Sequence, residues 1–226
     1  MEGNASKALG KSNLYFGAQR RYDRAVKTLR RPRPPASLEP RPAGRPPVGV
    51  CIMAGGQSSR MGRDKASLRL GGRTFITAIR QTAAALRCRV RIIRRDLQPG
   101  NGPLGGIHTG LKTSGAEAEV FLACDMPFIS PDLLRELLAR LGPRHDAVFA
   151  VSWYPEPALG GRMAGFPFVV RSALWPIVEG RLAAGELGLQ GLARALRARL
   201  WAVPARWRNQ LRNINTPEQW ARARMP

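Results

Sequence analysis

Acidic side chains, lysine, histidine and cysteine are all scarce in this chain, and long apolar runs are missing. Its 226 residues include 15 Asp and Glu, two His and three Cys. The cysteines have the spacing of neither a metal site nor a disulfide framework, so we expect buried thiols in a reducing compartment at Cys51, Cys88 and Cys124. No stretch approaches the roughly 20 apolar residues of a membrane span, and no apolar signal-peptide core stands near the N-terminus. We therefore predict a cytoplasmic protein that does not enter a membrane.

The positive charge is nearly all arginine. Lys and Arg together number 37, of which only five are lysines, and the formal net charge is +22. A basic surface favours polyanions, that is nucleic acid, nucleotides or a phosphorylated substrate. The sequence shows no recognition helix, zinc finger or aromatic-rich RNA-binding motif. Nucleic acid is therefore the least favoured of these partners.

The composition changes near residue 47. The stretch RPRPPASLEPRPAGRPP carries repeated prolines, which remove backbone donors and keep the chain extended. We predict a basic, Pro- and Arg-rich flexible leader over residues 1–47 and one folded domain over residues 48–226. Four interpretations of the leader stay open: a passive tail, an organelle transit peptide, a tether to nucleic acid or a membrane surface, and a start assigned too early.

Strands alternate with helices along the predicted domain. Apolar, β-branched runs predict strands over residues 48–56, 89–95, 119–128, 146–152 and 164–172. Helical spacing and N-cap residues predict helices over residues 74–87, 105–114, 130–141, 188–200 and 216–224. This alternation predicts a three-layer α/β/α Rossmann-like sandwich with a mostly parallel central sheet. Ligands of such sheets bind beyond the carboxyl ends of the strands, where unusual loops follow Gly55 and surround Asp125.

A glycine-rich loop, MAGGQSSRMGRDK (residues 53–65), follows the first predicted strand. Gly55 and Gly56 let the backbone approach a ligand closely, and consecutive N–H groups in such a turn bind anions. Arg60 offers a planar fork for phosphate oxygens, and Lys65 offers a compact charge. The pattern is neither the P-loop nor the dinucleotide motif. It indicates a phosphate-binding loop of another kind, and a plain glycine turn with solvated charges is the alternative.

The loop carries a family resemblance. Its AGGxSxRMGxDK pattern resembles the signature of nucleotidyltransferases, most closely the molybdenum cofactor guanylyltransferases. Three further segments match that family in order: GPLGGI (102–107), CDMPF (124–128) and NINTPEQ (213–219). Together the four motifs span nearly the whole domain. The resemblance implies transfer of GMP from Mg-GTP to molybdenum-bound molybdopterin, with release of pyrophosphate.

The resemblance also implies roles for single residues. The catalytic groups would be Arg60, Lys65 and Asp125, and Asp125 would hold Mg²⁺ because a carboxylate is a hard oxygen ligand. Fixed positive charges beside the reacting phosphates would stabilise the charge that develops there. The acceptor would be bound by Asn213 and Asn215. The nucleotide would be bound by Met53, Ala54, Gly55, Gly56, Lys65, Asp96, Pro103, Leu104 and Asp125.

Each of these roles has a structural alternative. For Asp125 the alternative is a capping or ion-paired acid, and for Asp96 it is an ion pair with the arginines before it. The segment around Thr216 is itself a good helix start. In GPLGGI we expect a rigid Gly-Pro turn and two glycines whose backbone lies against a base or ribose. His108, directly after this motif, matches no family function, and we expect it to be structural.

The chain departs from the family between the first helix and GPLGGI. Family members usually have two strands there, and the first ends in an Asn that contacts guanine. Here only RVRIIRRD precedes the loop, so one strand and that Asn have no counterpart. A cytidylyltransferase, a sugar- or alditol-phosphate nucleotidyltransferase and a catalytically weak nucleotide-binding paralogue therefore stay open. The expected partners are GTP and a molybdopterin-type phosphorylated acceptor, with contacts to a molybdoenzyme or cofactor chaperone left open.

Overall fold

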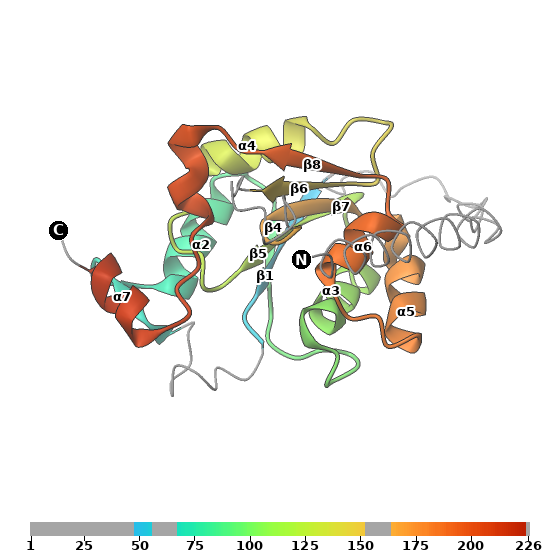
Figure 1. The fold of residues 1–226 in the computed structure, drawn as a ribbon, viewed down its shortest axis with the longest axis horizontal. Helices are drawn as coiled ribbons and strands as arrows, with labels where there is room; N and C mark the ends of the chain where they lie inside the picture. Colours follow the sequence, from blue (N-terminus) through green and yellow to red (C-terminus); the bar gives the residue numbers. More distant parts are fainter. Residues whose placement is uncertain (1–47, 56–66, 152–163, 225–226) are drawn as a thin grey trace, which may run out of the picture. The chain divides into compact units, whose positions relative to one another are not determined.

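The structure is a computed structural model that describes residues 48–55, 67–151 and 164–224. The predicted leader lies outside these residues. Six strands form the central sheet in the order β4-β1-β5-β7-β6-β8 (Figure 1). Their bounds are β1 Val48–Met53, β4 Arg89–Ile93, β5 Ala118–Ala123, β6 Ala147–Val151, β7 Phe168–Arg171 and β8 Ala198–Ala202. All neighbours are parallel except β7, which runs antiparallel to both β5 and β6.

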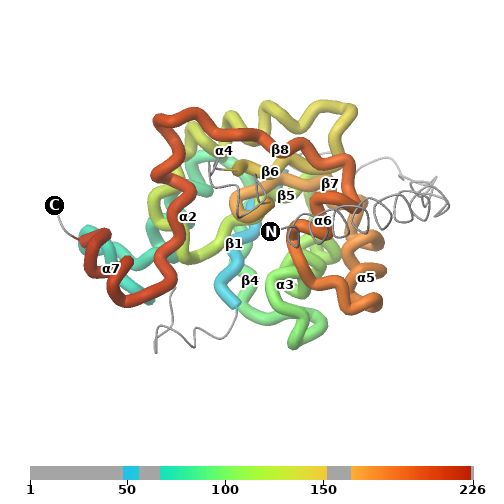
Figure 2. The backbone as a smooth tube through the Cα atoms, viewed as in Figure 1, coloured from blue at the N-terminus to red at the C-terminus, as the bar shows by residue number. Residues whose placement is uncertain are grey.

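Helices cover both faces of the sheet, which confirms the predicted three-layer architecture (Figure 2). On one face, α2 (Phe75–Ala84) and α4 (Pro131–Ala139) pack over a cluster that includes Val50 and Ile52 of β1. On the other face, α3 (Gly102–Lys112), α5 (Trp175–Ala183) and α6 (Leu189–Ala195) pack over a cluster that includes Cys51. Alternate residues of β1 thus enter opposite clusters. A strand with both faces covered has to be apolar throughout, as VGVCIM is.

Local signals at helix starts agree with the prediction. The Ser130 side chain accepts a hydrogen bond from the Leu133 N–H and so caps α4, and Pro131 occupies the first turn, where its missing N–H costs nothing. Thr74 caps α2 in the same way. Helix α7 (Pro217–Ala223) begins with a capping box between Thr216 and Gln219. These three starts follow from side-chain chemistry within four residues, which is why the sequence predicts them.

The helix predicted over residues 188–200 is wrong in its second half. Helix α6 ends at Ala195 because Leu196 is extended, and Ala198–Ala202 then form β8, which pairs in parallel with β6. A strand partner distant in sequence overrides the helical spacing there. Helix α3 begins at Gly102, three residues before the predicted start. Helix α5, the short hairpin of β2 (Arg69–Leu70) and β3 (Arg73–Thr74), and the 3₁₀ helices η3 (Ser172–Leu174) and η4 (Ala205–Leu211) were not predicted.

A single strand, β4, lies between α2 and α3, as the sequence predicts. It pairs directly with β1 and forms one edge of the described sheet.

In the described part of the chain, no helix has the length and apolar character needed to cross a membrane.

Candidate active site

The carboxyl end of β1 lies between two neighbours that end at the same level. Met53 pairs with Ile93 of β4 and with Ala123 of β5. Beyond the strand, the Ala54 N–H donates to the Ile93 carbonyl at 2.9 Å, and the Cys124 N–H donates to the Met53 carbonyl at 3.1 Å. The glycine-rich loop, the turn after β4 and CDMPF therefore leave the sheet side by side. This is the edge at which ligands of parallel sheets bind.

Gly55 has no room for a side chain. A Cβ atom at this position would lie 2.9 Å from the Arg94 carbonyl oxygen, closer than real Cβ contacts come. The residue is itself exposed, so solvent reaches its backbone. The glycine lets the loop pass close to the turn after β4.

The two glycines at the centre of GPLGGI pack against protein. A Cβ on Gly105 would lie 2.8 Å from Asp96 Oδ2, and one on Gly106 would overlap Met53 Cε. Both glycines are buried and their Cβ positions face protein, so they serve packing here, and contact of their backbone with a base or ribose stays a prediction. They allow the first turns of α3 to approach the sheet edge closely.

The other two binding residues predicted in GPLGGI differ in exposure. Pro103 is exposed, whereas the Leu104 side chain is fully buried in the core beneath α3. Because the whole Leu104 residue is buried in this structure, its predicted contact with the nucleotide stays a prediction. Pro103 stands in the first turn of α3 and presents its ring to solvent.

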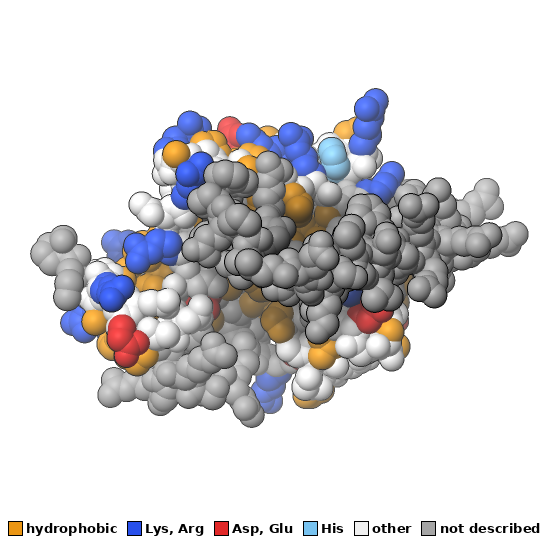
Figure 3. All heavy atoms as spheres, viewed as in Figure 1, with side chains coloured by type: hydrophobic (Ala, Val, Ile, Leu, Met, Phe, Trp, Pro, Cys, Tyr) orange, Lys and Arg blue, Asp and Glu red, His pale blue; other side chains and the backbone are white. Residues whose placement is uncertain are grey.

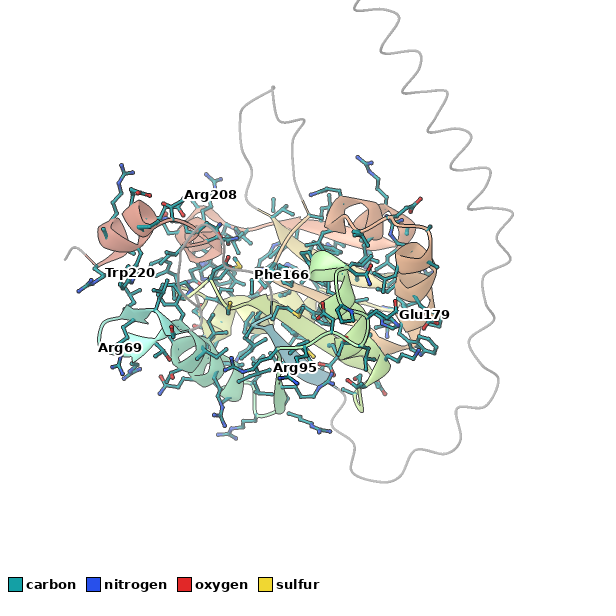
Figure 4. All side chains as sticks on the ribbon, turned by 90° about the horizontal axis from the view of Figure 1, so that it is seen from below. Arg69, Arg95, Phe166, Glu179, Arg208 and Trp220 are labelled. Atoms are coloured by element: carbon teal, nitrogen blue, oxygen red, sulfur yellow. The ribbon has the colours of Figure 1, made fainter. Side chains whose placement is uncertain are left out.

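Asp96 lies against this start of α3. Its carboxyl oxygens face the Cα atoms of Gly105 and Gly106, and partial burial raises the pKa of the carboxyl above its ordinary value. Among the described ion pairs, none joins Asp96 to Arg94 or Arg95. Both arginines are exposed, and Figure 4 shows Arg95 at the surface. The predicted alternative, an ion pair within this turn, is therefore not what holds the acid in place.

CDMPF and NINTPEQ meet through their backbones. The Ile214 N–H donates to the Asp125 carbonyl at 2.8 Å, so the Asn213–Asn215 segment lies beside the turn that carries Asp125. The Ile214 side chain is buried with Leu68 and Phe75, which anchors the segment. Asp125 itself is half-buried. This contact joins the fourth motif to the edge where the first three already meet.

The Asn213–Asn215 segment has a structural role besides its predicted one. The Gln219 side chain accepts hydrogen bonds from the N–H groups of Asn215 and Thr216 at the start of α7. The helix-start alternative is therefore confirmed for this stretch. Asn213 is exposed and Asn215 is half-buried, and their binding of an acceptor stays a prediction.

Gly56, Arg60 and Lys65 lie outside the described residues, so their predicted roles stay predictions. In the part of the chain that the structure describes, no group of three or more His, Cys, Asp or Glu side chains could hold a metal ion. Mg²⁺ needs less protein than that, because it is commonly bound by one or two carboxylates together with substrate phosphates and water. Asp125 at the end of β5 and Asp96 after β4 supply hard oxygen donors at this edge. These residues fit Mg²⁺ arriving with a nucleotide.

Arg212 is a residue that sequence reasoning missed. It directly precedes Asn213, and its guanidinium carbon lies 6.0 Å from the ring centroid of Phe128 in CDMPF. Its side chain is exposed. The available signal was a cation directly before a family motif.

His108 and Cys51 are packed in the interior. His108 is buried on α3, where its Nε2 lies 3.3 Å from Glu179 Oε1 of α5. Cys51 is also buried, and burial, with the nearby Glu119 carboxylate, raises the pKa of its thiol strongly. Cys88 and Cys124 are only partly buried, so the expectation of three buried thiols holds for one.

Comparisons with known proteins agree with this geometry. The family model described as MobA-like NTP transferase domain matches residues 50–96 and 78–203. A molybdenum cofactor guanylyltransferase of Xanthomonas euvesicatoria is 35% identical over 188 residues, which cover 79% of this chain and 94% of that protein. A molybdenum cofactor guanylyltransferase of Cereibacter sphaeroides is 32% identical over 196 residues, which cover 76% of this chain and 93% of that protein.

Solved structures share the fold. Molybdopterin-guanine dinucleotide biosynthesis protein A of Archaeoglobus fulgidus has a TM-score of 0.58 at 24% identity, covering 78% of this chain and 96% of its own. The 4-diphosphocytidyl-2C-methyl-D-erythritol synthase of Anaerococcus prevotii has a TM-score of 0.59 at 13% identity, and the match covers 79% of this chain and 97% of that one. At these identities the likeness concerns the fold alone. The family match and the relatives above carry the assignment: the chain is a nucleotidyltransferase and belongs to the MobA-like NTP transferase family, among the molybdenum cofactor guanylyltransferases.

Proposed function

We propose that this protein transfers GMP from Mg-GTP to molybdenum-bound molybdopterin and releases pyrophosphate. The observation that carries the proposal is the convergence of all four motifs at the carboxyl edge of β4, β1 and β5. The hydrogen bonds from Ala54 to Ile93, from Cys124 to Met53 and from Ile214 to Asp125 join three of the motifs to this edge. The packing of Gly106 against Met53 brings GPLGGI to the same edge. Relatives named molybdenum cofactor guanylyltransferase supply the donor base and the acceptor of the proposal.

In this mechanism the backbone at Ala54, Gly55 and Gly56 holds the nucleotide, and Arg60 and Lys65 neutralise its phosphates. Asp125 would hold Mg²⁺, and the ion would supply charge neutralisation on the triphosphate. A phosphate oxygen of the acceptor attacks the α-phosphorus of GTP, forming a new P–O bond, and the bond between the α-phosphorus and the bridging oxygen breaks to release pyrophosphate. The acceptor phosphate is already anionic at neutral pH, so the step needs no strong general base.

The position of β4 bears on base selection. Because β4 pairs directly with β1, the turn at Arg94–Asp96 stands immediately beside Gly55. In the proposed mechanism, contacts to the nucleoside from this side of the loop therefore come from that turn, which carries Asp96. The Asn213–Asn215 segment, on the side of β5, contacts the acceptor. Release of the product to a molybdoenzyme or cofactor chaperone, and a cytoplasmic location, stay predictions.

The test is pyrophosphate release by the full chain with Mg²⁺, molybdenum-bound molybdopterin and each of the four nucleoside triphosphates. We expect release with GTP only, and its loss in Asp125→Ala. Release that depends on CTP would overturn the guanylyl assignment and favour the cytidylyl alternative. Turnover only with sugar or alditol phosphates would identify a different acceptor, and the absence of any Mg²⁺-dependent turnover would favour a catalytically weak paralogue.

A further inference from the structure

A hollow separates the β2–β3 hairpin from α7. Its volume is about 740 Å³, and its lining comes from residues 67–72 of the hairpin region and from Trp220, Ala223 and Arg224 of the α7 end. We call it the Arg–Trp hollow. The indole N–H of Trp220 donates to the Arg69 carbonyl at 2.9 Å, which joins the two elements, and Figure 4 shows both residues at this end of the molecule. Among the described candidate site residues, none lines the hollow.

The floor of the hollow is part of a packed apolar cluster. Buried Leu68 packs with Phe75 and Ile214, and half-buried Leu70, Trp220 and Ala223 pack against that cluster. Gly71 and Gly72 form the hairpin turn with positive φ angles of 55° and 81°, a conformation that favours glycine. The Arg–Trp hollow is thus a surface whose shape is set by core packing and a tight turn.

The rim of the hollow is basic. Residues 67–74 and 217–224 contain four arginines and one acid, Glu218, so these two stretches carry a net charge of +3. Arg69 and Arg224 line the hollow, are exposed and belong to none of the described ion pairs, and the Arg69 guanidinium donates a hydrogen bond to the Gly72 carbonyl at 3.0 Å. Arg73 lies beside the hollow on β3, is also exposed, and donates to Gln81 Oε1 at 2.9 Å. Basic side chains gather at the α7 end in Figure 3. A local excess of positive charge favours an anionic partner.

The kind of anion follows from the lining. Most lining residues are exposed, so a small molecule would not be enclosed as ligand pockets usually enclose theirs. The guanidinium carbon of Arg224 lies 5.1 Å from the Trp220 ring centroid and covers that ring, which leaves it a poor platform for stacking a nucleic-acid base. Arginine forks match carboxylates, and Arg and Trp are the residues enriched at the energetic centres of protein interfaces.

We propose that the Arg–Trp hollow docks an acidic segment of another protein. In this complex, carboxylates of the segment pair with Arg69 and Arg224 in the hollow and with Arg73 beside it, and an apolar side chain packs on Leu70. The inference does not depend on which nucleotide or acceptor the enzyme uses.

The experiment selects displayed random dodecapeptides for binding to the full chain. The binding of the enriched peptides, labelled with a fluorophore, is then measured by fluorescence anisotropy. We expect enriched peptides that are acidic with an apolar residue. The triple variant Arg69→Glu, Arg73→Glu, Arg224→Glu should bind them at least about tenfold more weakly, a loss typical of charge reversal at an interface. Binding to the wild type should also weaken as salt is raised.

The matched control is the triple variant Arg89→Glu, Arg144→Glu, Arg199→Glu. It changes the net charge equally at three exposed arginines that also belong to none of the described ion pairs. It should bind the peptides like the wild type, and thermal melts of both variants check folding. The basic segment before residue 48 is the same in all three proteins, so its contribution cancels.

Four results would overturn the proposal: no enrichment, enriched peptides without acidic residues, equal losses in the two triple variants, or undiminished binding by the hollow variant. Displacement of the peptides by low concentrations of inorganic pyrophosphate would assign the hollow to a small anion. Displacement by single-stranded oligonucleotide at concentrations below those of the peptides would assign it to nucleic acid. Either displacement would also contradict docking of an acidic protein segment.

Discussion

Single glycines at the candidate site differ in what they permit. Gly55 lets the loop after β1 pass the Arg94 carbonyl, whereas Gly105 and Gly106 let α3 approach Asp96 and Met53. The neighbour at Gly55 is backbone and yields little, while Met53 Cε at Gly106 is the end of a flexible side chain. The same residue type in two motifs therefore serves loop geometry in one and helix packing in the other.

Gly55→Ala should be destabilising, because its Cβ would meet a backbone oxygen at 2.9 Å. We expect a loss of about 1–3 kcal/mol in the free energy of unfolding, measured with urea, as for other overpacked sites. Gly180→Ala on α5 is the control, since its Cβ would meet no atom within 4 Å and a helical alanine should stabilise. Equal stability of the two variants would show that the loop moves freely away from β4.

Asp96 should make stability depend on pH. Burial raises its pKa in the folded protein, so between the ordinary and the raised value the folded state binds more protons than the unfolded one. The contribution of this group to stability is therefore full below the ordinary pKa and is lost as pH rises through the folded pKa.

Asp96→Asn removes this loss. We expect a higher melting temperature than the wild type at neutral pH and no difference at pH values below the ordinary Asp pKa, as measured by thermal melts across that range. Asp132→Asn, an exposed acid on α4, should show no such gain. A variant less stable than the wild type at neutral pH would mean that the Asp96 carboxylate has a stabilising partner.

Among the elements, β4 is attached to the rest of the sheet by a buried ion pair. Arg91 of β4 donates from Nη2 to Glu119 Oε1 of β5 at 2.8 Å and to the Gly110 carbonyl of α3 at 2.6 Å. The Ser114 hydroxyl donates to the same Glu119 oxygen at 2.6 Å. Glu119 is 1% exposed and Arg91 14%. The pair therefore fastens an edge strand to its neighbours and to α3.

Removing one partner of this pair should cost more than removing both. Arg91→Met leaves the Glu119 carboxylate buried without its cation, and we expect a loss of about 3–5 kcal/mol in unfolding free energy. The double variant Arg91→Met, Glu119→Gln should recover part of that loss in the same urea experiment. Arg89→Met, at an exposed position of β4, is the control and should change little. A double variant with the summed loss of its single changes would show that the two side chains do not interact.

How far elements can be predicted depends on where their determinants lie. The starts of α4 and α7 follow from Ser130 and Thr216 with the proline after each, all within one turn of helix. The strand β8 follows from pairing with β6, about 50 residues earlier, and no local pattern distinguishes it from the end of a helix. At the site, the motifs predicted which segments meet. The burial of Gly105 and Gly106 depends on how α3 packs, which their sequence does not reveal.

At the scale of the whole molecule, the strand order of the sheet brings segments that are distant in the sequence to the same edge. Met53, Asp96, Asp125 and Ile214 are spread over more than 160 residues, yet parallel pairing of β4, β1 and β5 ends their segments at one level. The contact between Ile214 and Asp125 then brings in the last motif. Because each segment contributes backbone or one side chain, no single element carries the candidate site. Binding of Mg-GTP should consequently stabilise the entire domain rather than one loop.

That expectation gives the last prediction. A ligand that binds the folded state alone adds about 2.7 kcal/mol of stability at one hundred times its dissociation constant, so Mg-GTP should raise the melting temperature measurably. In Asp125→Asn, the difference between the shifts produced by Mg-GTP and by GTP with a chelator should disappear, because the proposed metal ligand has lost its charge. Asp132→Asn, which alters an exposed acid paired with Arg135 on α4, should keep that difference. If Asp125→Asn kept the full Mg²⁺-dependent shift, the ion would be held elsewhere, and the assignment of Asp125 would fail while the fold and the family stood.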